Sequence, residues 1–184
     1  MLKKALKIVG VSSILFIILY IFILSDYNPI FEHEEFVFIN KEVKNAQKEN
    51  LNPIVDIHNK IYQEIKEASC PCQALANNIV TDVHNTSLVK RALYLLKIKK
   101  EFSPNECLKF VLMNYDFGNK NIGIKEASKF YFNKNIDNLN EKEIITLVVM
   151  LKNSALYNPI RNPQGVANKV KVFQAILNRQ KKYE

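Results

Sequence analysis

The chain has 184 residues, of which 48% are hydrophobic and 24% charged, and it contains only 4 Gly and 6 Pro. This composition excludes a low-complexity disordered chain and a collagen-like chain, and the few turn-forming residues favour helices over a many-stranded β-sandwich. The formal net charge of +8 suits an anionic partner, such as phospholipid headgroups, a pyrophosphate or nucleic acid, or else reflects a solvated lysine-rich surface.

The N-terminal segment is predicted to be a membrane anchor. Residues 8–24 read IVGVSSILFIILYIFIL, an apolar run at the lower end of the length that spans a bilayer. Lysines precede the run and Asp26 follows it, so the N-terminus is expected in the cytoplasm and the rest outside. A cleaved signal peptide is the alternative, but LSDYNP contains no A-x-A-like cleavage site. We therefore expect a cytoplasmic tip and anchor over residues 1–26 and a second domain over residues 27–184.

The next part of the chain is expected to be irregular and then helical. Residues 27–52 are polar, with an aromatic patch, FEHEEFVFIN, that is expected to be a strand or a loop. Apolar residues at helical spacing predict amphipathic helices over residues 53–65 and 88–102, the first with proline at its start.

Capping signals place the remaining helices. Residues 103–106, SPNE, form a capping-box pattern with proline at the first helical position, and they open a helix with one apolar face. Two glycines bracket a polar loop, GNKNIG, and KEASKFYF follows as a short helix. A second capping box, NEKE over residues 140–143, opens IITLVVMLK, and Pro163 opens a final helix with a basic tail. The predicted fold class is all-α, with short connections.

The three cysteines and three histidines lack the spacing of a metal site. Cys70 and Cys72 form a C-x-C pattern, which is neither the C-x-x-C redox spacing nor one of two ligand pairs for zinc. We therefore expect no metal ligands and no disulfide framework. Cys107 lies on an apolar helical stripe and is expected to be a core residue.

An ordered set of short motifs runs from residue 103 to residue 177. The set resembles glycosyltransferase family 51, the peptidoglycan transglycosylase domain of penicillin-binding proteins and of monofunctional transglycosylases. The family runs through S-K-x-E-I-L-E-x-Y-L-N, F-G-x-x-x-x-G-I, A-x-x-Y-F-G-K, L-x-x-x-E-A-A-L-L-A and Y-N-P-x-R-N-P. The matching positions are Ser103, Glu106, Leu108, Leu112, Phe117, Gly118, Gly123, Ile124, Ala127, Tyr131, Phe132, Lys134, Leu139, Glu143, Tyr157, Asn158, Pro159, Arg161, Asn162 and Pro163. The resemblance implies a lysozyme-like helical domain behind a single N-terminal transmembrane helix.

The first catalytic motif of the family, E-D-x-x-F-x-x-H-x-G, lies upstream and carries a general base. Glu34 stands at the position of the glutamate, while Lys41 and Val43 replace the histidine and the glycine. The resemblance implies that Glu34 deprotonates the attacking sugar hydroxyl, for which a partly desolvated carboxylate is suited. A glutamate that merely solvates a loop is the alternative.

The second family motif, G-G-S-T-I-x-Q-Q-L-A-K-N, lines the donor site. Ser69 and Gln73 keep the serine and the first glutamine, so the resemblance implies that both contact substrate. Asn77 replaces the lysine, which removes a cation that would meet phosphate.

The third family motif, R-K-x-x-E, carries the second catalytic carboxylate. Its glutamate falls on Arg91, and no acidic residue lies between Asp82 and Glu101. A cation in place of a carboxylate conflicts with the mechanism of the family. Lys90 and Arg91 can still hold an anionic pyrophosphate.

Two functions follow from the resemblance. One is a divergent peptidoglycan transglycosylase that acts on the lipid-linked disaccharide precursor, with Glu34 as base and an unidentified residue or a divalent metal ion at the leaving group. The other is a catalytically inactive, membrane-anchored scaffold or regulator that binds the precursor, a glycan strand or cell-wall synthesis proteins. Either would sit in the bacterial cytoplasmic membrane with its domain on the periplasmic or extracellular side, with no other cofactor and no nucleic-acid partner. An unrelated tethered helical domain is a third possibility.

Overall fold

The computed structural model describes residues 2–31, 33–65, 70–79 and 88–182, without the side chains of residues 2–8, 33–35, 78 and 79. Within these ranges the regular structure is helical, and the only β-type pairing is an isolated bridge between Asp116 and Ile122. The prediction of an all-α chain is confirmed.

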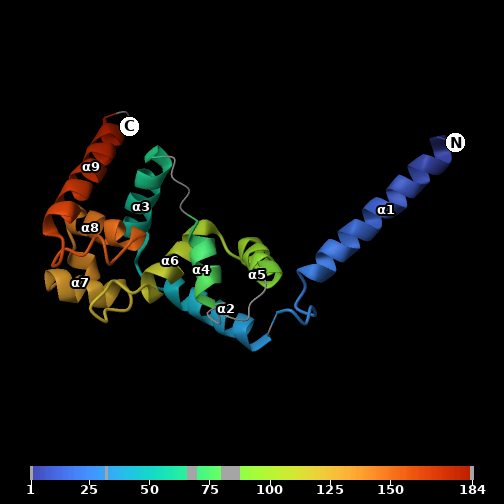
Figure 1. The fold of residues 1–184 in the computed structure, drawn as a ribbon, viewed down its shortest axis with the longest axis horizontal. Coiled ribbons are helices and arrows are strands. Elements are labelled where there is room, and N and C mark those ends of the chain that lie inside the picture. Colours follow the sequence, from blue (N-terminus) through green and yellow to red (C-terminus); the bar gives the residue numbers. More distant parts are fainter. Residues whose placement is uncertain (1, 32, 66–69, 80–87, 183–184) are drawn as a thin grey trace.

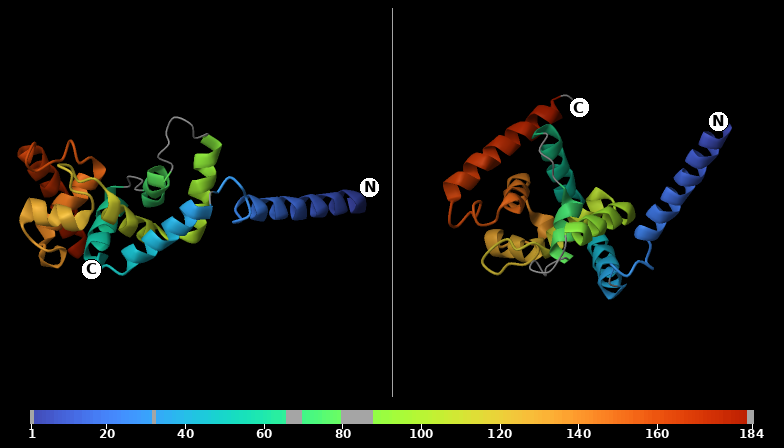
Figure 2. Two further views of the ribbon diagram at one scale, coloured as in Figure 1. Left: turned by 90° about the horizontal axis from the view of Figure 1, so that it is seen from below. Right: turned by 45° about the vertical axis from the view of Figure 1, so that its right-hand side comes forward.

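The helices in chain order are α1 (Leu2–Ile23), α2 (His33–Gln47), α3 (Asn52–Ile65), α4 (Pro71–Ile79), α5 (Leu88–Glu101), α6 (Pro104–Asn114), α7 (Ile124–Phe132), the 3-10 helix η1 (Ile136–Asn138), α8 (Glu141–Lys152) and α9 (Pro163–Lys181). Helix α1 projects away from the other helices (Figure 1), and two further views show the same separation (Figure 2). Among the residues whose side chains are described, no helix combines the length and the apolar character needed to cross a membrane.

Helix α2 is the largest difference from the expected secondary structure. The patch FEHEEFVFIN was expected to be a strand or a loop, and this is wrong, because His33–Gln47 forms one helix. Its buried side chains recur every three or four residues, the period of a helix with one buried face: Phe36, Ile39, Val43 and Ala46. The period becomes visible only when the polar residues after the patch are taken together with it.

Helix α6 is shared by two hydrophobic cores. The C-terminal core is formed with α3, α7, α8 and α9, and the N-terminal core with α2, α4, α5 and the segment after α1. Leu108 and Leu112 face the C-terminal core, whereas Cys107 and Val111 face the N-terminal core. Each pair is spaced by four residues, so the two pairs form adjacent rows on the helix surface. Helix α6 therefore holds the two halves of the domain together.

Both predicted capping boxes are present. At the start of α6, the Ser103 Oγ accepts a hydrogen bond from the backbone N–H of Glu106 at 3.3 Å, and the Glu106 carboxylate accepts one from the backbone N–H of Ser103 at 2.8 Å. At the start of α8, Asn140 and Glu143 exchange the equivalent bonds at 3.0 and 2.8 Å. These bonds satisfy backbone donors that a helix leaves free at its N-terminus.

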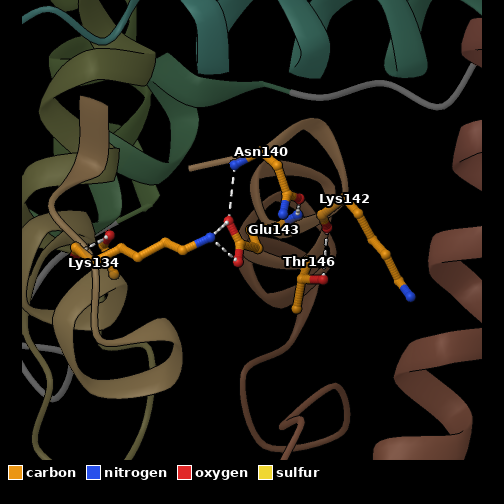
Figure 3. Close-up of polar contacts among 6 residues, drawn as sticks. Lys134, Asn140, Lys142, Glu143 and Thr146 are labelled. Atoms are coloured by element: carbon orange, nitrogen blue, oxygen red, sulfur yellow. Dashed lines mark hydrogen bonds and ion pairs between the residues drawn. The ribbon is translucent and has the colours of Figure 1, made fainter. Parts of the chain in front are cut away.

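The carboxylate of Glu143 also links α7 to α8. Lys134, two residues after α7 ends, donates from Nζ to both Glu143 carboxylate oxygens, at 2.7 and 3.0 Å (Figure 3). The hydrogen bond from Lys134, followed by that from the backbone N–H of Asn140, lowers the pKa of Glu143 below its usual value. Both partners favour the ionised carboxylate in the folded state.

This lowered pKa predicts a pH-dependent role for Glu143. A carboxyl group whose pKa is depressed by folding stabilises the fold above its unfolded pKa, and that stability is lost as the pH falls through the folded pKa. Glu143→Gln should therefore cost about 1 kcal/mol at pH 7, a modest value because Lys134 is partly exposed. In urea unfolding, the difference between the two proteins should shrink as the pH falls through the lowered folded-state pKa of Glu143.

The same ion pair provides a control for this prediction. Lys134→Met should destabilise the unchanged chain more than it destabilises Glu143→Gln, because the second protein has already lost the charged partner. A stability difference between the unchanged chain and Glu143→Gln that stays constant between pH 7 and pH 3 would contradict the prediction.

Candidate functional site between α4 and α5

The structure places three of the predicted site residues on two neighbouring helices. Gln73 lies in the first turn of α4, and Lys90 and Arg91 lie in the first turn of α5. Glu34 belongs to the first turn of α2, but its side chain lies outside the described residues, and Ser69 lies outside them entirely. The roles expected for Glu34 and Ser69 stay predictions.

A contact between Arg91 and Asn77 joins the two helices. The Arg91 Nη2 donates to the Asn77 Oδ1 at 3.5 Å, which is at the long limit of a hydrogen bond. Asn77 lies four residues after Gln73, so both amide side chains project from the same face of α4. Gln73 and Asn77 are exposed and Arg91 is half-buried. Two of the positions that depart from the family motifs, Asn77 and Arg91, are thus in contact.

Lys90 lies over an aromatic cluster. Its Nζ is 5.5 Å from the ring centroid of Tyr94, one helical turn further along α5, a distance at which a cation is attracted to a ring. The Tyr94 ring packs against Phe31 at 5.2 Å and Phe36 at 5.4 Å between centroids. Because Phe36 belongs to the first turns of α2, the cluster brings the beginning of α2 next to α5.

The described charges at this site are positive. Helix α4 has no charged side chain, and the one acidic residue of α5 is Glu101. Glu101 is ten residues beyond Arg91, which is about 15 Å along the helix. The site can therefore bind an anion such as phosphate through Lys90 and Arg91, while neither helix supplies a carboxylate beside Arg91.

A disulfide fixes the helix that carries Gln73. Cys72 in the first turn of α4 is bonded to Cys107 in α6, with an S–S distance of 2.11 Å. No disulfide framework was expected, and this single bond was not predicted, although Cys107 is a core residue as expected. The C-x-C pattern pairs Cys72 with Cys70 in the sequence, but Cys70 is free and exposed. The partner of Cys72 is 35 residues away, outside any local pattern. The predicted location outside the cytoplasm was a signal that could have favoured a disulfide.

A buried lysine, also not predicted, ties α5 to the segment after α1. Lys97 is only 1% exposed, and its Nζ lies 2.5 Å from the Asp26 Oδ1 and 3.9 Å from the Glu101 Oε1. The same ammonium lies 4.4 Å from the ring centroids of both Phe31 and Phe36. Two aromatic faces and two carboxylates thus replace the water that a lysine loses on burial.

The burial of Lys97 predicts an asymmetric response to mutation. Asp26→Ala should cost about 2 kcal/mol in urea unfolding, because it leaves a buried ammonium with only the more distant Glu101. The cost is less than that of breaking a fully buried pair, since the Asp26 side chain is 76% exposed. Lys97→Met should cost less than about 1 kcal/mol, since an apolar side chain of similar length removes the desolvated charge.

The control for this asymmetry is Glu101→Gln, which removes the distant carboxylate and should have a smaller effect than Asp26→Ala. Equal losses for Asp26→Ala and Lys97→Met would show that the Asp26–Lys97 pair is worth more than its desolvation costs, and this would contradict the prediction.

Several residues of the family-like set meet in the C-terminal half. The Tyr131 hydroxyl donates to the backbone carbonyl of Phe117 at 2.8 Å and accepts from the Asn158 amide at 3.1 Å. The Asn158 Oδ1 accepts from the backbone N–H groups of Ile160 and Arg161 at 2.9 and 3.2 Å. Asn158 is 1% exposed, so this hydrogen-bonded cluster has a structural role.

Comparison with known families matches residues 59–179, about two thirds of the chain, to the transglycosylase family. The matched range includes Gln73, Lys90 and Arg91, and it begins after Glu34.

Curated relatives are penicillin-binding proteins. The chain is 27% identical to penicillin-binding protein 1F of Bacillus subtilis over 119 residues, which is 64% of this chain and 17% of that protein. It is 32% identical to penicillin-binding protein 1A of Neisseria flavescens over 114 residues, which is 60% of this chain and 14% of that protein. It is 27% identical to penicillin-binding protein 4 of Bacillus subtilis over 145 residues, which is 77% of this chain and 22% of that protein. The chain thus spans about a sixth of the length of the first two relatives. By the match over residues 59–179, the chain belongs to the transglycosylase family.

Proposed function

We propose that this chain binds the lipid-linked disaccharide precursor of peptidoglycan through its diphosphate, and that its polymerising activity is lost or much reduced. The observation that carries the proposal is the Arg91–Asn77 contact. A guanidinium stands where the family pattern has its second carboxylate, and the nearest acidic residue on α5 is about 15 Å away along the helix.

The charges at the site suit a diphosphate. Arg91 offers N–H donors beyond the one used by Asn77, and a guanidinium binds phosphate oxygens through two parallel hydrogen bonds. Lys90 adds a second positive charge in the same turn of α5. The exposed amide of Gln73 can both donate and accept hydrogen bonds, as a sugar hydroxyl requires.

We also propose that α1 holds the domain at a membrane, in the lysozyme-like arrangement that the resemblance implies. Its 22 residues extend about 33 Å, and its side chains from Val9 to Phe22 are mostly large, apolar and exposed. Three lysines precede Val9 and favour a cytoplasmic N-terminus. The Cys72–Cys107 disulfide supports a location of the domain outside the cytoplasm, where such bonds persist.

The proposal is tested by binding of the lipid-linked precursor to the purified full chain in lipid nanodiscs. We expect Arg91→Ala to weaken binding by about tenfold or more, because a charge-assisted pair with phosphate is removed. The matched control is Arg179→Ala, which removes an exposed arginine of α9 and should leave binding unchanged. Absence of binding by the unchanged chain, or equal effects of the two substitutions, would refute the proposal.

The second candidate is the transglycosylation of the family, which the family match favours. In that case Glu34 is the base, and an unidentified residue or a divalent metal ion assists the leaving group. Incubation with labelled precursor separates the two candidates. Glycan polymer that forms with the unchanged chain and disappears in Glu34→Gln would establish the enzyme, whereas we expect binding without polymer.

A further inference from the structure

A polar pocket lies at the C-terminal core, and none of its lining residues belongs to the α4–α5 site. It has a volume of about 340 Å³ and is formed by the α2–α3 connection, α7 and η1. Its lining residues are Glu49, Asn50, Lys125, Glu126, Lys129, Asn135, Ile136 and Asp137. Pockets that hold small molecules begin at about 300 Å³, so this one is large enough for a sugar ring with a substituent.

Part of the pocket lining is held by an ion pair, and part of it consists of exposed polar side chains. The Lys125 Nζ is 2.6 Å from the Glu49 Oε2, which ties α7 to the α2–α3 connection. In the described part of the chain, the side chains of Asn50, Asn135 and Asp137 form no hydrogen bond or ion pair. Two exposed amides and an exposed carboxylate thus line the pocket and can exchange water for a ligand.

The composition of the lining limits the class of ligand. Two lysines face three carboxylates, so a phosphate-like anion meets a net negative surface. The positive charges of the two lysines repel a metal ion. Ile136 is the one apolar side chain in the lining, so the pocket does not suit an apolar ligand. What remains is an uncharged molecule with both donors and acceptors of hydrogen bonds and a small apolar part. An N-acetylated amino sugar has hydroxyl and amide groups of this kind, together with a methyl group for Ile136.

We infer that this pocket binds an N-acetylated amino sugar of a glycan strand, as an accessory site separate from the α4–α5 site. The inference rests on the proposed function, because a protein that binds the precursor works where such strands are made. Asn135 and Asp137 hydrogen-bond the sugar from η1 and the connection that precedes it. Lys129 and Asn50 reach the sugar from α7 and from the α2–α3 connection.

The probe is the β-1,4-linked tetramer of N-acetylglucosamine, titrated into the full chain in nanodiscs and followed by calorimetry and saturation-transfer NMR. The test protein carries Asn135→Ala with Asp137→Ala, two exposed side chains whose removal breaks no hydrogen bond within the described structure. The matched control carries Asn178→Ala with Asp56→Ala, the same chemical change at exposed positions of α9 and α3. Thermal unfolding verifies that both proteins fold.

We expect the tetramer to bind the unchanged chain and the control equally, and the pocket variant at least about tenfold more weakly. Equal affinity for the pocket variant, or no saturable binding at millimolar concentration, would overturn the inference. Arg91→Ala separates this result from that for the proposed function, since it should weaken precursor binding and leave tetramer binding intact. Tetramer binding that is lost in Arg91→Ala and kept in the pocket variant would place the sugar at the α4–α5 site and overturn the inference.

Discussion

Loss of the Cys72–Cys107 disulfide is expected to lower the free energy of unfolding by about 4 kcal/mol. The bond closes a loop of 35 residues, and the chain entropy that such a loop removes from the unfolded state corresponds to that value. The bond also joins the first turn of α4, which carries Gln73, to α6, the helix shared by both cores. Its loss should therefore weaken precursor binding as well as stability.

The disulfide prediction is measured by urea unfolding of the unchanged chain and of Cys72→Ala with Cys107→Ala. Cys70→Ser is the matched control, because Cys70 is exposed and free, and it should unfold at the midpoint of the unchanged chain. Reductant should shift the midpoint of both the unchanged chain and Cys70→Ser and should leave that of the double variant in place. Coincident curves for the oxidised and reduced chain would contradict the prediction.

Gly123→Ala should destabilise the domain by about 3–5 kcal/mol. Gly123 has φ +83° and ψ 153°, a backbone conformation that glycine adopts and other residues avoid. A Cβ at this position would lie 2.4 Å from the backbone carbonyl oxygen of Met113, so the end of α6 would have to move away from the start of α7. The cost of about 3–5 kcal/mol is the sum of the strained backbone conformation and the displacement of the neighbouring backbone.

Substitutions at two other glycines serve as comparisons for Gly123→Ala. Gly118 also has a positive φ, +86°, but its nearest neighbour would be the side-chain nitrogen of Asn158 at 3.3 Å, so Gly118→Ala should cost about 1–2 kcal/mol. Gly10 lies inside α1 with nothing within 4 Å of an added Cβ, and Gly10→Ala should leave the unfolding of the domain unchanged. If Gly123→Ala unfolded at the same midpoint as Gly10→Ala, the assignment of strain to Gly123 would be contradicted.

Local patterns in the sequence were sufficient for the helices of the C-terminal half. A capping box involves residues three positions apart, so the starts of α6 and α8 could be predicted without any tertiary contact. Helices α3 and α5 followed from apolar spacing within one element. Helix α2 was missed because its buried face extends beyond the aromatic patch to Val43 and Ala46, where the surrounding residues are polar.

The contacts that sequence analysis missed join distant residues. The disulfide partners are 35 positions apart, and Asp26 and Lys97 are 71 positions apart. Nothing in the neighbourhood of either residue indicates its partner, and a lysine is normally expected at the surface. The motif positions Gln73 and Arg91 lie on the neighbouring helices α4 and α5, and the binding roles expected for them stay predictions. Glu34 and Ser69 stay predictions.

The Lys97 contact bears on where the chain can be shortened for biochemical work. A truncation that begins at α2 removes the last turn of α1 and the segment that follows it, although Leu24 and Phe31 are buried in the N-terminal core. It also removes Asp26 and leaves the Lys97 ammonium buried with one carboxylate 3.9 Å away. A shortened chain that begins at Leu24 retains these partners, so we expect it to be more stable than one that begins at α2.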